Sequence, residues 1–132
     1  MKTVLFACVQ NAGRSQMAGA FFNLLADASR ARAMSAGTRP ADHVHSQVVD
    51  VMREVGVDLS GVRPCLLTPE LASQATLLVT MGCGEECPFV PGLERDDWAL
   101  PDPHGESLER VRAIRDDIRA RVERLVVDRG WR

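Results

Sequence analysis

The stretch VLFACVQNAGRSQMAGAFF, residues 4–22, contains the features that decide the fold of this chain. Its apolar start, residues 4–7, is typical of a buried strand and leads directly into Cys8. From Ser15 onward, apolar side chains recur at helical spacing, which predicts a helix. We therefore predict a strand, a tight loop and a helix, with a thiol where the loop begins and the guanidinium of Arg14 where it ends.

The composition of this loop predicts a site for a tetrahedral oxyanion. Successive backbone N–H groups in such a loop form an anion-binding cradle, and the following helix adds the positive end of its dipole. Asn11 and Gly13 tolerate the positive φ that a tight loop requires. Arg14 can donate two parallel hydrogen bonds to two oxyanion oxygens. The predicted oxyanion-binding residues are Val9, Gln10, Asn11, Ala12, Gly13, Arg14 and Ser15.

Cys8 is the candidate nucleophile of this loop. The field that binds an anion also favours the thiolate form of a cysteine, and Ser15 can donate its hydroxyl to that thiolate. The alternative is a buried structural cysteine before a helix, with Arg14 at the surface. The strand, the spacing of five residues between Cys8 and Arg14, and the Asn, Gly and Arg-Ser residues together favour the catalytic interpretation.

Length and composition limit the class of protein. A chain of 132 residues is long enough for one domain with a single core, so we expect one domain over residues 1–132. A formal net charge of -2 offers no electrostatic attraction to nucleic acid or to an anionic membrane. No apolar run approaches the ~20 residues of a membrane helix, and the N-terminal run is too short for a signal peptide. We expect a cytoplasmic monomer.

The rest of the chain alternates between strand and helix patterns. Parallel βαβ units follow from this alternation, which predicts an α/β fold with its ligand beyond the carboxyl ends of the strands. A loop is expected over residues 82–96. We expect strands over residues 3–7, 31–35, 76–81 and 98–100, long helices over 15–28, 44–55 and from 106 onward, and a short helix capped by Thr68 with Pro69 first.

Asp102 is the candidate general acid. It lies between Pro101 and Pro103, and a following proline biases a residue toward extended backbone. A carboxyl group held in this way can protonate a departing oxygen. Taken alone Asp102 is a turn residue, but its place at the same sheet edge as Cys8 favours the catalytic interpretation.

Cys83 and Cys87 follow the third predicted strand and are separated by three residues. Such a pair can form a redox disulfide, bind a metal or remain two unreacting thiols. No second Cys/His pair follows at the spacing of a zinc site, so we predict no metal. Gly82 and Gly84 flank Cys83 and permit the loop movement that thiol exchange requires, which favours the redox interpretation.

Five further residues receive structural interpretations. Cys65 is expected to be a small buried residue and Trp98 a core or lid residue. His43, His45 and His104 lack the spacing of a metal site, and we assign them no function.

Over essentially its whole length the chain resembles the low-molecular-weight protein tyrosine phosphatase superfamily, and within it the arsenate reductases coupled to thioredoxin or to a low-molecular-weight thiol. The resemblance implies one three-layer α/β domain with a four-stranded parallel sheet flanked by helices. It is carried by residues 8–18, Ser35-Ala36-Gly37, Val79-Thr80-Met81, Cys83, Cys87-Pro88, Trp98 and Asp102-Pro103.

The resemblance also implies a mechanism of arsenic detoxification. Cys8 attacks arsenate, Arg14 and the loop amides hold its oxygens, and Asp102 protonates the leaving oxygen. Cys83 then attacks Cys8 and releases arsenite, and Cys87 converts the resulting disulfide into Cys83–Cys87. The implied reductant is thioredoxin, a mycoredoxin-type protein or a thiol such as mycothiol, with no tightly bound cofactor and with phosphate or sulfate as competing anions.

Two other functions remain open. A phosphatase would hydrolyse phosphate monoesters through a cysteinyl-phosphate on Cys8, and a sensor would bind the oxyanion without turnover. Phosphatases of the superfamily usually place tyrosines around the cleft, and this chain has none, which favours the reductase. Two positions depart from the family pattern: Gly82 separates the strand from Cys83, and Gly19 occupies the place of an acidic cation ligand, so no cation site is predicted.

Overall fold

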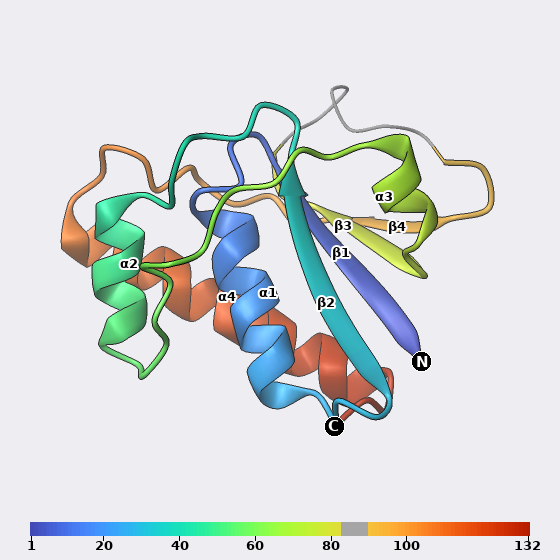
Figure 1. The fold of residues 1–132 in the computed structure, drawn as a ribbon. Coiled ribbons are helices and arrows are strands. Elements are labelled where there is room, and N and C mark those ends of the chain that lie inside the picture. The colour runs from blue at the N-terminus through green and yellow to red at the C-terminus, as the bar shows by residue number, and fades with distance from the viewer. Residues whose placement is uncertain (83–89) are drawn as a thin grey trace.

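The computed structural model describes residues 1–82 and 90–132, and its described strands form one four-stranded sheet (Figure 1). The strands are β1 (Lys2–Cys8), β2 (Ala31–Gly37), β3 (Leu77–Thr80) and β4 (Glu94–Asp97). Every neighbouring pair runs parallel, in the spatial order β2-β1-β3-β4. The order places β1 inside the sheet, and its residues 4–7 are fully buried.

Helices cover both faces of the sheet (Figure 1). The helices are α1 (Arg14–Leu25), α2 (Ser46–Arg53), α3 (Pro69–Ser73) and α4 (Leu108–Asp128). Val4 and Phe6 of β1 join the larger core with side chains of α1, α2 and α4. Leu5 points to the opposite face, where it packs with Ala72 of α3. Because strand side chains alternate between faces, β1 contributes to both cores, and the predicted α/β fold with a four-stranded parallel sheet flanked by helices is confirmed.

Two of the helices begin at side-chain caps. The hydroxyl of Thr68 accepts a hydrogen bond from the Leu71 N–H (3.1 Å), with Pro69 as the first helical residue, which confirms the predicted start of α3. Ser107 caps α4 in the same way, accepting from the Arg110 N–H (3.2 Å). The helix therefore starts at Leu108, two residues after the predicted start.

The prediction of an edge strand over residues 98–100 is wrong. The fourth strand is β4, which begins four residues earlier, and three of its four residues lie in the stretch 82–96 that was expected to be a loop. Its side chains, Glu-Arg-Asp-Asp, are all exposed, so no apolar alternation marks it as a strand. Trp98 follows the strand and donates its backbone N–H to the Thr80 carbonyl (2.8 Å), while its ring packs on Phe6 at 5.6 Å between centroids. Trp98 is therefore a core residue.

The sheet carries the candidate chemistry at one edge. The carboxyl ends of β1 and β3 lie side by side, since Ala7 pairs with Thr80. The loop after β1 therefore lies beside Gly82, two residues beyond β3. In the described part of the chain, no helix is both long and apolar enough to cross a membrane.

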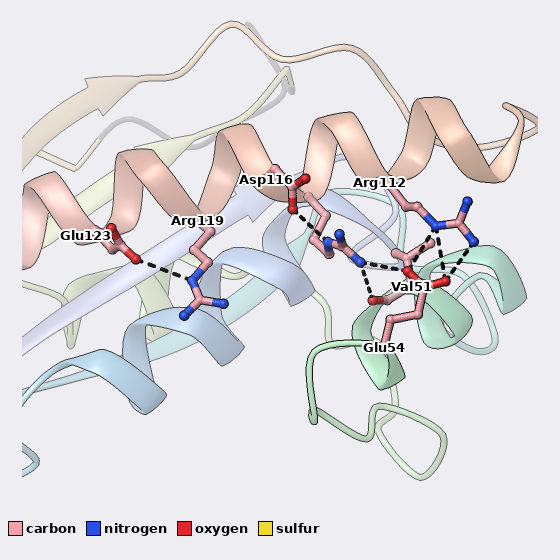
Figure 2. Close-up of polar contacts among 7 residues, drawn as sticks. Val51, Glu54, Arg112, Asp116, Arg119 and Glu123 are labelled. Carbon is pink, nitrogen blue, oxygen red and sulfur yellow. Dashed lines mark hydrogen bonds and ion pairs between the residues drawn. The ribbon is translucent and has the colours of Figure 1, made fainter.

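A cluster of charges joins the end of α2 to α4 (Figure 2). Glu54 accepts hydrogen bonds from the guanidinium of Arg112 (2.7 Å) and from Arg115 Nη1 (2.9 Å). Arg115 also donates to the Val51 carbonyl (2.8 Å) and pairs with Asp116. The hydrogen bonds from Arg112, followed by those from Arg115, lower the pKa of Glu54 from 4.5 to about 2.

We expect Glu54→Gln to lower the melting temperature at pH 7 and to remove part of the acid sensitivity of the fold. The pKa of Glu54 is depressed in the folded state, so its contribution is present above about pH 4.5 and is lost as the pH falls toward 2. Melting curves from pH 2 to 7 test this, with the difference from wild type largest at neutral pH. Glu123→Gln is the matched control, because Glu123 pairs only with Arg119 one turn away on α4 (Figure 2). An equal difference at every pH would contradict the prediction.

Candidate active site

The loop between β1 and α1 turns several backbone carbonyls outward, toward the segment that follows β2. Four of them accept hydrogen bonds of 2.8–3.2 Å from backbone N–H groups of that segment. In a trans peptide plane, the C=O and the next residue's N–H point in opposite directions. The amides that follow these carbonyls therefore point to the inner side of the loop, where an anion can be held. The acceptors are Cys8, Val9, Gln10 and Ala12, and the donors are Thr38, Arg39, Ala41 and His45, respectively.

Asn11 holds the loop in shape from within. It adopts the predicted positive φ, of 50°, and is fully buried. Its Oδ1 accepts from Gln16 Nε2 (3.0 Å) and from the Cys65 N–H (2.9 Å), and its Nδ2 donates to Ser15 Oγ (2.7 Å). One side chain thus ties the loop to α1 and to the segment before α3.

Gly13 is small for a reason other than the predicted one. Its φ is -144°, so the expectation of positive φ is wrong at this position. A Cβ atom on Gly13 would instead lie 2.8 Å from Pro103 Cγ. The glycine allows the proline-rich loop of Asp102 to pack directly on residues 9–13 between β1 and α1, which form the oxyanion loop.

Cys8 presents its sulfur beside the start of α1. Its Sγ lies 2.9 Å from Ser15 Oγ, and the residue is 2% exposed. Because Ser15 Oγ already accepts from Asn11, its own proton is available to the sulfur. The helix begins at Arg14 without a side-chain cap at Gly13, so the first-turn N–H groups have no cap acceptor. The Ser15 hydroxyl can therefore donate a hydrogen bond to the Cys8 sulfur.

The guanidinium of Arg14 is bonded to one loop and lies close to the backbone at Gly82. The residue is 7% exposed, and Nη1 donates to the Leu100 carbonyl (3.2 Å). A Cβ atom added to Gly82 would collide with the same nitrogen. Gly82 also has a φ of +97°. The glycine that departs from the family pattern is thus required both by its backbone conformation and by Arg14.

Gly82→Ala is expected to displace the Arg14 side chain. We expect this to lower kcat/KM for the reaction at Cys8 on the order of 10²-fold, because small misplacements of a positioning group have effects of this size. Steady-state kinetics measure the loss. Gly92→Ala is the matched control: Gly92 also has a positive φ, of +80°, but a Cβ atom there meets nothing within 4 Å. If both variants lose the same activity, backbone strain is the cause and not the contact with Arg14.

One small pocket brings the main candidates together. Asp102 reaches it from the loop before α4, and its Oδ1 accepts a hydrogen bond from the His104 N–H (3.0 Å). Cys8, Arg14 and Asp102, the three residues to which the sequence assigned candidate catalytic groups, therefore line the same pocket. The pocket is lined by Cys8, Gln10, Ala12, Gly13, Arg14, His45 and Asp102.

His45 lines this pocket, although sequence analysis assigned it no function. Its backbone N–H donates to the Ala12 carbonyl (3.0 Å), and its ring is half-buried and stacked on His104. Burial lowers the pKa of His45, His104 and His43 lower it further, and the Asp102 carboxylate opposes them. The only sequence signal was its place at the start of a helix on the carboxyl side of a strand.

The remaining predicted residues are placed as follows. Cys83 and Cys87 lie outside the described residues. The expectation that Cys65 is buried is wrong, because the structure exposes its side chain while its backbone serves Asn11. Within residues 1–82 and 90–132, no group of three or more His, Cys, Asp or Glu side chains is arranged to hold a metal ion.

Known proteins match almost the whole chain. A protein of Halobacterium salinarum is 44% identical over 125 residues, which cover 89% of this chain and 85% of that protein. The glutaredoxin arsenate reductase of a Synechocystis species is 36% identical and covers 96% of this chain and 97% of its own. The solved thioredoxin-dependent arsenate reductase of Corynebacterium glutamicum has a TM-score of 0.81 at 38% identity over 95% of this chain; this chain spans 60% of that structure's length.

A family model agrees with these matches. Residues 3–129 match the model described as low molecular weight phosphotyrosine protein phosphatase. The match includes the loop after β1, the arginine at its end and the Asp102 loop. The strand order, the cradle and the aligned relatives therefore lead to one assignment: this chain belongs to the low molecular weight phosphotyrosine protein phosphatase family.

Proposed function

We propose that this protein is an arsenate reductase that converts arsenate to arsenite through Cys8. The observation that carries the proposal is the shared pocket, in which a serine-supported sulfur, a buried guanidinium and the Asp102 carboxyl group surround an anion cradle. The Synechocystis and Corynebacterium proteins named as arsenate reductases support this choice of substrate.

The first step is nucleophilic displacement at arsenic. The Cys8 thiolate forms an S–As bond while one As–O bond breaks. Arg14 and the inward amides hold the remaining oxygens, and Asp102 gives its proton to the departing hydroxyl, which leaves as water. Phosphate and sulfate have the same tetrahedral shape and are expected to compete for the cradle.

The second step moves two electrons to arsenic. A second thiolate attacks the Cys8 sulfur, an S–S bond forms, the S–As bond breaks, and its electron pair stays on arsenic, which leaves as arsenite. Cys83 is the proposed attacking thiol, because it directly follows Gly82, and Gly82 lies so close to Arg14 of the pocket that a Cβ atom there would collide with the guanidinium. Cys87 then attacks Cys83 and regenerates the Cys8 thiolate.

The Cys83–Cys87 disulfide needs an external dithiol or thiol to close the cycle. The relatives include a thioredoxin-dependent arsenate reductase and a glutaredoxin arsenate reductase, so a thiol–disulfide reductant is the proposed partner class. Thioredoxin is the first to test, followed by a mycoredoxin-type protein with mycothiol.

We further propose that the protein is a cytoplasmic monomer with one domain over residues 1–132 and no tightly bound cofactor.

The function is tested by coupling the protein to thioredoxin, thioredoxin reductase and NADPH. Arsenate-dependent loss of NADPH at 340 nm is the expected result, with release of arsenite. Hydrolysis of an aryl phosphate without arsenate-dependent oxidation would favour the phosphatase. Binding of arsenate with neither activity would favour the sensor. The mycothiol system is run in parallel, so that a wrong reductant is distinguished from a wrong substrate.

The proposed thiol–disulfide exchange among Cys8, Cys83 and Cys87 is tested by mass spectrometry of tryptic peptides after a single arsenate turnover. We expect Cys87→Ser to accumulate a Cys8–Cys83 disulfide and Cys83→Ser to stop before arsenite release. Cys65→Ser is the matched control, because the Cys65 side chain is exposed and only its backbone supports the loop. Full reductant-linked turnover by Cys87→Ser would remove Cys87 from the mechanism.

A further inference from the structure

Two histidine rings join the oxyanion loop to the loop that carries Asp102. The imidazoles of His45 and His104 stack with their centroids 4.5 Å apart and an interplanar angle of 23°. His45 donates its backbone N–H to the Ala12 carbonyl, so it is bonded to the oxyanion loop. His104 donates its backbone N–H to Asp102 Oδ1 (3.0 Å). The stack therefore connects a residue that lines the pocket to the loop of its candidate acid.

The contact made by the neighbouring proline restricts the same loop. Pro103 is buried, and Gly13 leaves room for it, because a Cβ atom at Gly13 would lie 2.8 Å from Pro103 Cγ. Three consecutive residues, 102–104, thus make three different contacts. Asp102 faces the pocket, Pro103 packs on the oxyanion loop, and His104 stacks on His45.

We propose that the stacked rings of His45 and His104 are a positioning device that holds Asp102 over the bound oxyanion, and that this device weakens when both rings are protonated. The inference deepens the proposed function, since it rests on Asp102 acting as the acid. His45 and His104 are positioning residues here, and neither ring is assigned a bond to the reacting atoms.

The charges around His45 determine the direction of the pH effect. His104 and His43 face it with charges of like sign, the Asp102 carboxylate faces it with the opposite sign, and Cys8 and Arg14 line the same pocket. Burial is the largest cause that lowers the pKa of His45, so its neutral ring is favoured at pH 7. Two protonated rings repel each other. Because the pKa of His45 is lowered, His45 takes up its proton only below the ordinary histidine value of ~6.5, and we expect the stack to weaken in that acid range.

The kinetic test compares His104→Ala with His104→Phe. We expect His104→Ala to lower kcat roughly tenfold, a part of the 10²–10⁴-fold that a general acid contributes, and to change the inhibition constant of inorganic phosphate less than twofold. His104→Phe keeps a flat ring without a titrating nitrogen, so it is expected to restore kcat and to lose activity less steeply below pH 6.5. His43→Ala, which removes an exposed histidine outside the stack, is the matched control for kcat at neutral pH.

A double-mutant cycle separates positioning from general stability. If the stack acts through Asp102, His104→Ala has no further effect on kcat in an Asp102→Asn background. Equal losses in both backgrounds would overturn the proposal. So would an acid limb that is the same in wild type and His104→Phe.

An NMR titration tests the stack without arsenate turnover. Failure of the stack can therefore be distinguished from failure of the proposed function. Spectra of the imidazole Cε1–H groups and of the Asp102 carboxyl carbon are recorded in inorganic phosphate, with and without His104→Ala. The expected results are a rise in the pKa of His45, loss of its ring-current shift and a displaced Asp102 resonance. Unchanged His45 and Asp102 resonances would overturn the stack even if arsenate is reduced.

Discussion

Replacing Cys8 with serine is expected to abolish arsenate-dependent oxidation of the reductant, by on the order of 10⁴-fold or more, as removal of a nucleophile generally does. A serine hydroxyl stays protonated at neutral pH and is a far weaker nucleophile than a thiolate. The groups beside the sulfur, Ser15 Oγ at 2.9 Å and the first turn of α1, remain in the variant.

Cys8→Ser is nevertheless expected to fold and to bind phosphate. The substitution changes one buried atom, and the Asn11 hydrogen bonds and the outward carbonyls that shape the cradle do not involve it. Isothermal titration with inorganic phosphate and a melting curve check this, while NADPH oxidation checks the chemistry. Turnover by Cys8→Ser above a tenth of wild type would contradict Cys8 as nucleophile. A loss of phosphate binding together with the fold would show a structural role instead.

Replacing Arg14 with lysine is expected to lower kcat/KM for arsenate about 10²–10³-fold, the effect of removing one preorganised donor from an oxyanion site. Lysine keeps the positive charge, but it lacks the planar pair of donors that binds two oxygens at once. Arg14 Nη1 donates to the Leu100 carbonyl, which leaves other guanidinium nitrogens to bind the anion. Lysine has a single side-chain nitrogen, so it cannot make both contacts in this way.

The comparison of two arginines isolates geometry from charge. Arg110→Lys on the exposed face of α4 preserves charge in the same way and is expected to leave kcat/KM unchanged. Kinetics at several arsenate concentrations, with phosphate inhibition constants, separate weakened binding from slowed chemistry. If Arg14→Lys keeps half of the wild-type kcat/KM, charge alone suffices and the bidentate role is wrong.

The local patterns in the sequence were sufficient to predict the strand, loop and helix around Cys8. An apolar run before Cys8 and helical spacing after Ser15 predicted β1 and α1, because hydrophobic periodicity reports directly on burial. Asn11 and Arg14 were identifiable from residue type and spacing, and the structure places both at the loop. By contrast β4 was missed, because a charged edge strand is held by backbone bonds to β3 and not by apolar side chains.

The sequence by itself determined the α/β alternation, the strand–loop–helix unit with Cys8 and Arg14 at its two ends, and the proline-flanked Asp102, because these features depend on residues close together in the chain. Only the tertiary structure decided which side chains meet across the pocket. Arg14 reaches the Leu100 carbonyl across 86 positions of sequence. The contact of Gly13 with Pro103 and the stack of His45 on His104 likewise arise only when α2 and the loop before α4 pack around the oxyanion loop. Such contacts follow from how whole elements are packed, and no local pattern of residues specifies them.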